Sequence, residues 1–377
     1  MQTEKVLYVA TSDIHLATFH QPYINWLVEN GVQVDIAVEN RGNLKLKNVT
    51  NEFHLKFPRS VFKKELLSSY KELKKIIDRE KYSLIHCHTP IPSMLTRLAA
   101  RKAKKKGTKV LYTAHGFHFY KGGPISRWFT YYPAELFLSI FTDAIITINR
   151  EDFDYVNQKW FHKDAYYIKG IGVDSSRFKP LNHEQKTAKR LELGIDPGNF
   201  VLLYVAEFIP RKNHEFIIRS APILQNSIPN LQILFAGKGE LLDEMKTLAK
   251  QLNVEKYIDF LGFRNDVYVL SAVADVGISA SKHEGLGLGL TEEMFCKVPI
   301  VASYDRGHKE MIVHGVNGYM FGQGNQEAFV AYILDLYQNE EKRKAMGVKA
   351  LQKAQEFEIS NSLNSMIQIY RQYLKIK

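Results

Sequence analysis

The chain has 377 residues, of which 45% are apolar, and this length and composition predict a large globular protein with two domains. Its two cysteines, Cys87 and Cys296, lie far apart in apolar sequence, which excludes a disulfide framework and indicates buried thiols in a reducing compartment. No stretch reaches the roughly 18 apolar residues of a membrane span and no secretory signal follows Met1, so we expect a cytoplasmic protein.

The net positive charge belongs entirely to the first half of the chain. Residues 1–180 hold 28 lysines and arginines against 17 aspartates and glutamates, whereas residues 181–377 hold 23 of each. A basic half joined to a neutral half predicts an anionic partner, which could be a membrane surface, a lipid phosphate or a nucleic acid, while a merely solvated basic face is the alternative. Nucleic acid is disfavoured, because no nucleic-acid-binding motif is present and the aromatic residues form no recognisable platform for a single strand.

The first half alternates apolar strands with amphipathic helices, in the rhythm of βαβ units. This alternation predicts an open parallel sheet, in which ligands bind at the carboxyl ends of the strands. The expected strands are 5–10, 32–38, 84–88, 110–114, 142–149 and 166–169, and the expected helices are 19–30, 66–79 and 93–106.

Polar residues follow several of these strands and are the first candidates for a ligand site. The polar turn 11–15, with Ser12 and His15, follows the first strand, and Asn149 ends another. His115 and Phe117 lie in the loop after the strand 110–114. A histidine at the carboxyl end of a strand can bind a sugar hydroxyl or orient an acceptor, and we expect His115 to do so.

The histidines of this half could also be read as a metal site. His86, His88, His115 and His118 lie at strand ends, but no carboxylate or cysteine accompanies them at tight ligand spacing. Neutral histidines in such places commonly form hydrogen bonds. We therefore predict no metal ion.

Basic and aromatic residues are mixed in residues 121–133, directly before the apolar run 134–141. Such a mixture suits the membrane interface, where aromatic rings lie at headgroup level and cations meet lipid phosphates. An ordinary helix with a buried aromatic face is the alternative. An irregular connection over 170–198 then holds the expected domain boundary.

The second half repeats the alternation of strands and helices. Arg211 and Lys212 follow the first strand of this half, where cations can meet a bound phosphate. Gly262 and Phe263 follow another strand and could flank a flat base. The expected strands are 200–206, 231–235 and 258–261, and a helix is expected from 214 to 221.

The most informative stretch is 281–294, in which three alternate glycines open a helix that we expect to begin near Leu288. Glycines let the backbone approach a ligand, and a helix N-terminus attracts a phosphate. Glu284 and Glu292 flank the glycines and can accept hydrogen bonds from vicinal hydroxyls, which suggests a diphosphate with sugars on both sides. A tight turn with helix-capping acids is the alternative, since the spacing is not that of the dinucleotide fingerprint.

Taken together, these motifs resemble the donor-binding domain of glycosyltransferase family 4, retaining enzymes with a GT-B fold of two facing Rossmann-like domains. The resemblance spans 205–321, and the first half is similar to the capsule and exopolysaccharide branch of the family. The pieces that carry it are 207–213, 235–239, 260–262, Glu284 with Glu292, 297–303 and 317–321 in the second half, and 88–90, 113–117 and 142–143 in the first.

The resemblance implies roles for individual residues. Lys212 and Arg211 would bind the donor diphosphate, Glu284 would contact the transferred sugar and Glu292 would hold the ribose. Backbone N–H groups would come from Gly285, Leu286 and Gly287, a flat base would lie by Gly262 and Phe263, and His115 would lie beside the sugar, so that His115, Lys212 and Glu284 form the catalytic set. One departure is Glu207, where many members of the family have an arginine.

The resemblance also implies a reaction. A sugar, such as an N-acetylhexosamine or a deoxy form, would pass from a UDP-sugar to a polyprenyl diphosphate-linked acceptor at the inner face of the cell membrane, with no cofactor and no obligatory metal. The acceptor domain would be 1–180 with a returning helix 357–377, and the donor domain would be 181–356. A UDP-sugar 2-epimerase of the same fold and a non-catalytic peripheral membrane-binding protein remain alternatives.

Overall fold

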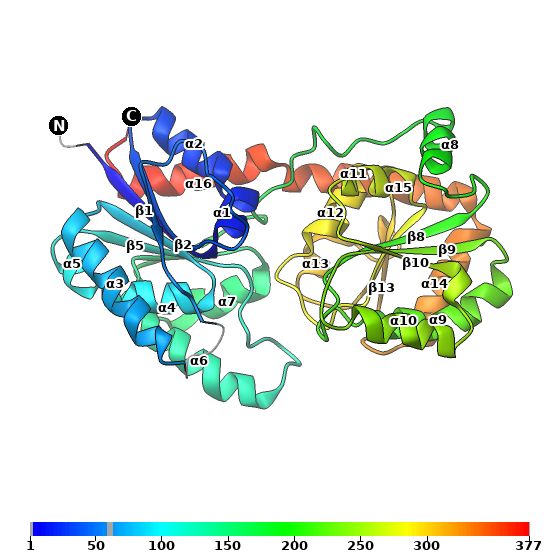
Figure 1. The fold of residues 1–377 in the computed structure, drawn as a ribbon, viewed down its shortest axis with the longest axis horizontal. Coiled ribbons are helices and arrows are strands. Elements are labelled where there is room, and N and C mark those ends of the chain that lie inside the picture. Colours follow the sequence, from blue (N-terminus) through cyan, green and yellow to red (C-terminus); the bar gives the residue numbers. More distant parts are fainter. Residues whose placement is uncertain (1–2, 59–62, 377) are drawn as a thin grey trace. The chain divides into compact units, whose positions relative to one another are not determined.

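The computed structural model describes residues 3–58 and 63–376, and their contacts divide the chain into two compact units. One unit comprises Met1–Gly172 with Ser360–Lys377, and the other comprises Val173–Ile359. The boundary thus lies at residue 172, whereas the sequence suggested 180. Each unit contains one parallel sheet with helices on both faces (Figure 1). Within the described residues, no helix combines the length and the apolar character that a membrane crossing requires.

The sheet of the first unit has seven parallel strands in the order β3-β2-β1-β4-β5-β6-β7. The chain order reverses at β1, and this is where an open α/β sheet forms a crevice for ligands. The central strands are buried on both faces, as the continuous apolar runs predict. The strands are β1 (Lys5–Ser12), β2 (Gln33–Glu39), β3 (Asn51–His54), β4 (Leu84–His88), β5 (Lys109–Ala114), β6 (Ala144–Thr147) and β7 (Asp164–Tyr167).

Eight helices pack around this sheet in the described residues. The predicted basic helix 93–106 is in fact two helices, α4 and α5, which meet at Ala100. The helices are α1 (Asp13–Phe19), α2 (Gln21–Glu29), α3 (Glu65–Glu80), α4 (Pro90–Ala99), α5 (Arg101–Lys105), α6 (Ile125–Ser139), α7 (Arg150–Lys159) and α16 (Ile359–Tyr373).

The first strand is longer than the sequence predicts, and the predicted polar turn after it is not a turn. β1 ends at Ser12, whose side chain accepts a hydrogen bond from the N–H of His15 and thereby caps α1. The predicted first helix is interrupted at His20, because Pro22 cannot lie inside a helix and instead stands in the first turn of α2. His15 consequently lies within the short helix α1, and His20 directly follows that helix.

The last helix, α16, belongs to the first unit. The Tyr370 hydroxyl is fully buried, where it bonds to the hydroxyl of Tyr8 and lies 2.8 Å from Nδ1 of His86. The N–H of Lys375 donates to the Glu4 carboxylate, so the two ends of the chain lie together (Figure 1). The chain returns to this unit at Ser360, whereas the sequence suggested 357.

The sheet of the second unit has six parallel strands in the order β10-β9-β8-β11-β12-β13, and β8 is the reversal point. Its strands are β8 (Phe200–Val205), β9 (Leu231–Ala236), β10 (Ile258–Gly262), β11 (Val276–Ser279), β12 (Ile300–Ser303) and β13 (Gly318–Phe321). Its helices are α8 (His183–Glu192), α9 (His214–Ser227), α10 (Leu242–Gln251), α11 (Val267–Val273), α12 (Leu288–Phe295), α13 (His308–Met311), α14 (Gln326–Gln338) and α15 (Glu340–Ala354).

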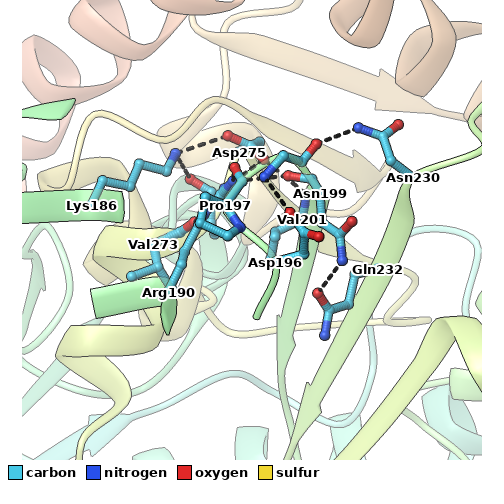
Figure 2. A network of polar contacts seen from close by, with 12 residues as sticks. Lys186, Arg190, Asp196, Pro197, Asn199, Val201, Asn230, Gln232, Val273 and Asp275 are labelled. Atoms are coloured by element: carbon cyan, nitrogen blue, oxygen red, sulfur yellow. Dashed lines mark hydrogen bonds and ion pairs between the residues drawn. The ribbon is translucent and has the colours of Figure 1, made fainter. Parts of the chain in front are cut away.

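A largely buried carboxylate, that of Asp275, fastens α8 to the amino-terminal edge of this sheet (Figure 2). Asp275 pairs with Lys186 at 2.8 Å and with Arg190 at 2.7 Å, and it also accepts a hydrogen bond from the N–H of Val201 at the start of β8. Arg190 donates further to the carbonyls of Val273 and Asn199. Burial raises the pKa of Asp275, but the two cations outweigh burial and hold that pKa below its usual value.

We therefore expect Asp275→Asn to lower the free energy of unfolding of the second unit by about 3 kcal/mol, because two cations would be left without their counter-charge. The carboxylate's contribution is present above its unfolded pKa of about 3.9 and is lost as the pH falls through the lower folded pKa. Calorimetric unfolding at pH 7 would measure the loss. Glu192→Gln, which removes an exposed pair with Lys189, is the control and should change little. An equal change in the free energy of unfolding in the two variants would contradict this account.

Candidate functional site

The carboxyl edge of the second sheet brings together two cations and a buried carboxylate. Arg211 and Lys212 lie in the loop after β8, and Glu284 lies in the loop after β11. Arg211 Nη1 is 2.7 Å from Glu284 Oε2, and Lys212 Nζ is 2.5 Å from Glu284 Oε1. Burial raises the pKa of Glu284, but the charges of Lys212 and Arg211 outweigh it and lower the pKa to about 2. The carboxylate is therefore ionised throughout the neutral range and holds both cations in place.

The backbones of these two loops are also bonded to each other. The Tyr204 hydroxyl donates to the carbonyl of Lys212 and lies 3.0 Å from the Ser281 hydroxyl. The N–H of Lys282 donates to the carbonyl of Arg211 at 2.8 Å. These bonds fix the cations on a rigid support before any ligand arrives.

The glycine-rich loop lies directly beyond Glu284 and leads into α12. The helix begins at Leu288, as predicted, and Gly287 stands at its N-cap with φ of +102°, a conformation that a side chain would strain. In the described structure no side chain caps this N-terminus. It therefore provides N–H groups and a positive dipole end within one short loop of the two cations.

Glu292 is the fifth residue of α12. Burial raises its pKa to about 7, and Arg177 opposes that rise only in part. The next residue, Glu293, is fully buried, and burial together with the charge of Glu292 raises its pKa well above the usual value. Glu293 faces Gly277 of β11 and has no hydrogen-bond partner within the described part of the chain.

A second glycine loop flanks the site on the β9 side. A Cβ at Gly237 would lie 1.9 Å from the carbonyl oxygen of Ala206, so only glycine lets this loop pack against the segment that carries the cations. Gly262 ends β10 with φ of +67°, and the neighbouring Phe263 ring is 65% exposed. Lys238 lies over that ring, 5.8 Å from its centroid.

The loop after β12 contributes residues that the sequence reading did not single out. Asp305 accepts hydrogen bonds from the N–H groups of Glu284 at 3.0 Å and Gly307 at 2.7 Å. His308 lies beside Gly287, bonded through Nδ1 to the carbonyl of Ser303, and its buried Nε2 has no partner among the described residues. The sequence could have indicated Asp305 and His308, because both follow a strand of the parallel sheet, and the same position had singled out Arg211.

Four histidines of the first unit gather at the carboxyl edge of its sheet. Nε2 of His20 is 3.3 Å from Nε2 of His15, and Nε2 of His115 is 3.3 Å from Nδ1 of His88. Burial lowers the pKa of His15 to about 4, and burial together with neighbouring imidazoles lowers the pKa values of His20, His88 and His115 well below their usual range. All four rings are therefore neutral at physiological pH.

Of the four histidines that were considered from the sequence as metal ligands, only His88 and His115 belong to this cluster. His86 lies behind the cluster, where it bonds to Thr113 and Tyr370, and the His118 ring stacks on Tyr131. His88 and His115 are joined instead by His15, within α1, and by His20, directly after it.

Two residues expected at a ligand-binding cleft are buried in the core of the first unit. The Phe117 ring stacks on Phe119 with 4.9 Å between centroids, and the backbone N–H of Phe117 donates to the Asp152 carboxylate. Asn149 caps α7 by accepting from the N–H of Asp152 and donating to its carboxylate. Ser12 is likewise a helix cap. These three residues were expected from the sequence at a ligand site, whereas the structure shows Ser12 and Asn149 as helix caps and the Phe117 ring in the core. His15 and His115 keep partial exposure.

Comparisons with known proteins agree with these two units. Residues 185–353 match the family model described as glycosyl transferases group 1, and residues 5–149 match the model described as glycosyl transferase 4-like. EpsD of Bacillus subtilis (strain 168), provisionally named a glycosyltransferase, is 39% identical over 375 residues, which cover 99% of this chain and 97% of EpsD.

More distant relatives extend the picture. The UDP-Gal:alpha-D-GlcNAc-diphosphoundecaprenol alpha-1,3-galactosyltransferase of Escherichia coli is 29% identical over 272 residues, covering 71% of this chain and 68% of that protein. The structure of HepE from Anabaena, solved in complex with UDP and glucose, superposes with a TM-score of 0.81 at 18% identity, covering 98% of this chain and all of HepE, and so shows the same GT-B fold. The chain therefore belongs to glycosyltransferase family 4 and is a glycosyltransferase with a GT-B fold.

Proposed function

We propose that the protein transfers a sugar from a UDP-sugar to a polyprenyl diphosphate-linked acceptor, with retention at the anomeric carbon, in the assembly of a capsular or extracellular polysaccharide. The observation that carries this proposal is the pair of cations on Glu284 next to the N-terminus of α12. Together they form a positively charged site that favours an anion such as the diphosphate of a sugar nucleotide.

The donor side of the proposal rests on the second unit. Arg211 and Lys212 would bind the diphosphate, with N–H groups from residues 285–287, and Arg211 would supply the charge that Glu207 does not. The exposed Phe263 ring, beside Gly262, would flank the base. The choice of UDP is supported by HepE, whose structure contains UDP, and by the UDP-Gal in the name of the Escherichia coli relative.

The proposed chemistry relies on electrostatics and positioning. Fixed cations and the helix N-terminus would stabilise the departing diphosphate, and its phosphate oxygen would take the proton of the acceptor hydroxyl as the new glycosidic bond forms on the same face. Glu284 would accept hydrogen bonds from hydroxyls of the transferred sugar, Glu292 would hold the ribose, and His115 would contact the sugar from the first unit. No step needs a metal ion.

The acceptor side rests on an apolar cavity of about 700 Å³ in the first unit. It lies between α4 and α6 and reaches Thr11, near the carboxyl end of β1, and Pro90, just after β4. A lipid chain could lie in this cavity with its diphosphate at the strand ends. The diphosphoundecaprenol in the name of the Escherichia coli relative supports this class of acceptor.

The neighbouring surface has the features of a membrane-docking face. Ile125 and Phe129 of α6 are 73% and 78% exposed, and Ile140 follows at the end of that helix. The guanidinium of Arg101 on α5 lies 5.6 Å from the Phe141 ring centroid, so basic and apolar groups adjoin. Such a surface suits peripheral binding to an anionic membrane.

Changing the two acids should separate their roles. Glu284→Gln should lower turnover by about 10²–10³-fold, because the sugar loses a charged acceptor. UDP itself should bind at least as tightly, because both cations are released to its phosphates. Glu292→Gln should instead weaken UDP about tenfold, through the lost hydrogen bonds to ribose. Calorimetric titration of both variants with UDP, together with turnover assays, measures these effects. Parallel losses of UDP affinity in both variants would contradict the assignment.

Removing charge from the α5 surface should weaken membrane binding. A triple change of Lys102, Lys105 and Lys106 to glutamine should reduce affinity for anionic liposomes roughly hundredfold, at about 1 kcal/mol per cation. Lys104 is spared because it pairs with Asp143 at 2.6 Å. The matched control neutralises three exposed lysines of the second unit, Lys246, Lys250 and Lys256. Liposome sedimentation that fails to distinguish the two triple variants would exclude α5 as the docking surface.

A further inference from the structure

The four-histidine cluster of the first unit is drawn from three separate parts of the chain. His15 lies on α1, His20 follows that helix, His88 ends β4 and His115 follows β5. One ring nitrogen from each of the four lies within 4.8 Å of the others. Nothing in the proposed transfer uses His20 or His88, so this convergence needs an explanation of its own.

The spacing of one nitrogen pair is that of two ligands on a single metal ion. Nε2 of His15 and Nε2 of His20 are 3.3 Å apart. Tetrahedral coordination with metal–nitrogen bonds of about 2.0–2.1 Å places neighbouring nitrogens about 3.3–3.4 Å apart. Binding of one ion would require ring movements that bring the other nitrogens, which lie within 4.8 Å of one another, to that spacing.

An unsatisfied nitrogen points in the same direction. His88 is fully buried, and its Nε2 has no hydrogen-bond partner within the described residues. A buried polar atom without a partner costs free energy, and a bound ion is one of the few things that would remove that cost. The ring is also held between Tyr8, which stacks on it at 5.7 Å, and His20, at 3.9 Å between centroids.

The ligand atoms that the cluster offers decide which class of metal ion it would bind. Only imidazole nitrogens take part within the described residues, with no carboxylate or thiolate. Neutral imidazoles favour zinc, copper, nickel and cobalt, whereas magnesium and calcium require oxygen ligands.

We propose that His15, His20, His88 and His115 bind one divalent transition-metal ion, with zinc as the reference ion, and that its binding inhibits glycosyl transfer. The inhibition rests on the proposed function, because a metal ion held by His115 occupies the nitrogen that would contact the sugar. The metal site itself does not depend on that function.

Metal binding is tested directly on the full chain without a polyhistidine tag. After treatment with EDTA and its removal, the protein should bind one zinc ion per chain with micromolar or tighter affinity and should bind no magnesium. Cobalt should give the intense visible absorption of tetrahedral coordination. This wild-type spectrum requires no variant and so does not depend on whether a variant folds. Absence of saturable zinc binding would overturn the proposal, whatever the protein's affinity for UDP.

Variants then assign the ligands. His20→Asn and His88→Asn should each weaken zinc binding by more than about tenfold. His54→Asn, at an exposed position of β3 in the same unit, is the matched control and should bind zinc as the wild type does. Near-ultraviolet circular dichroism identifies any variant that is misfolded. Equal affinity in all three variants would show that zinc binds elsewhere and would overturn the assignment.

Turnover tests the inhibitory part separately. Stoichiometric zinc should lower wild-type turnover at least tenfold, and EDTA should restore it. His54→Asn should show the same inhibition. Full activity with zinc bound would overturn the inhibition while leaving the site intact, and loss of activity in EDTA would contradict the metal-free transfer instead.

Discussion

The second unit depends on two cations that a buried carboxylate holds at a strand end. Charges that approach each other in a partly dry environment attract strongly, but removing them from water is costly, so such a group persists only with full pairing and hydrogen bonding. Glu284 meets this condition with one oxygen on each cation. Its lowered pKa keeps the arrangement ionised at any physiological pH. The site is therefore organised before the donor arrives, and little reorganisation is left for the reaction itself.

The surrounding loops follow from that constraint. The contact between Tyr204 and Ser281 holds the segment that carries the two cations against the segment that carries the carboxylate. Asp305, from the loop after β12, accepts a hydrogen bond from the N–H of Glu284 and so fixes that residue as well. Close packing of Gly237 against Ala206 sets the position of the same segment from the side of β9. Parallel strands end at one edge, so residues 73 and 77 positions apart in sequence come within one hydrogen bond of each other.

Much of this arrangement could be predicted from the sequence. The strand β4 and the start of α12 lie where apolar runs and glycines placed them, and the family followed from ordered motifs. The short, half-exposed strand β3 was missed, because it has no apolar run. Phe117 and Asn149 were expected at a ligand site, and their burial was not foreseen, because a polar or aromatic residue at a strand end can cap a helix or fill the core as readily as it can face a ligand.

The histidine cluster shows most clearly that the spacing of residues along the sequence does not reveal which side chains meet in the fold. His15 and His20 are brought to His88 and His115 only because Pro22 breaks the first helix and β1 lies beside β4. Local spacing near His88 and His115 had argued against a metal, since ligands were sought nearby in sequence. Three-dimensional convergence supplies the partners that the local pattern lacks.

The most direct test of the central claim is a calorimetric titration of the full chain with UDP, UMP and GDP, on the wild type and on a variant with Arg211→Ala and Lys212→Ala. The account predicts that UDP binds at least tenfold more tightly than either UMP or GDP and that the double variant loses the advantage of UDP over UMP. Equal binding of UDP and UMP to the wild type, or an unchanged preference in the double variant, would show that these cations do not bind the diphosphate.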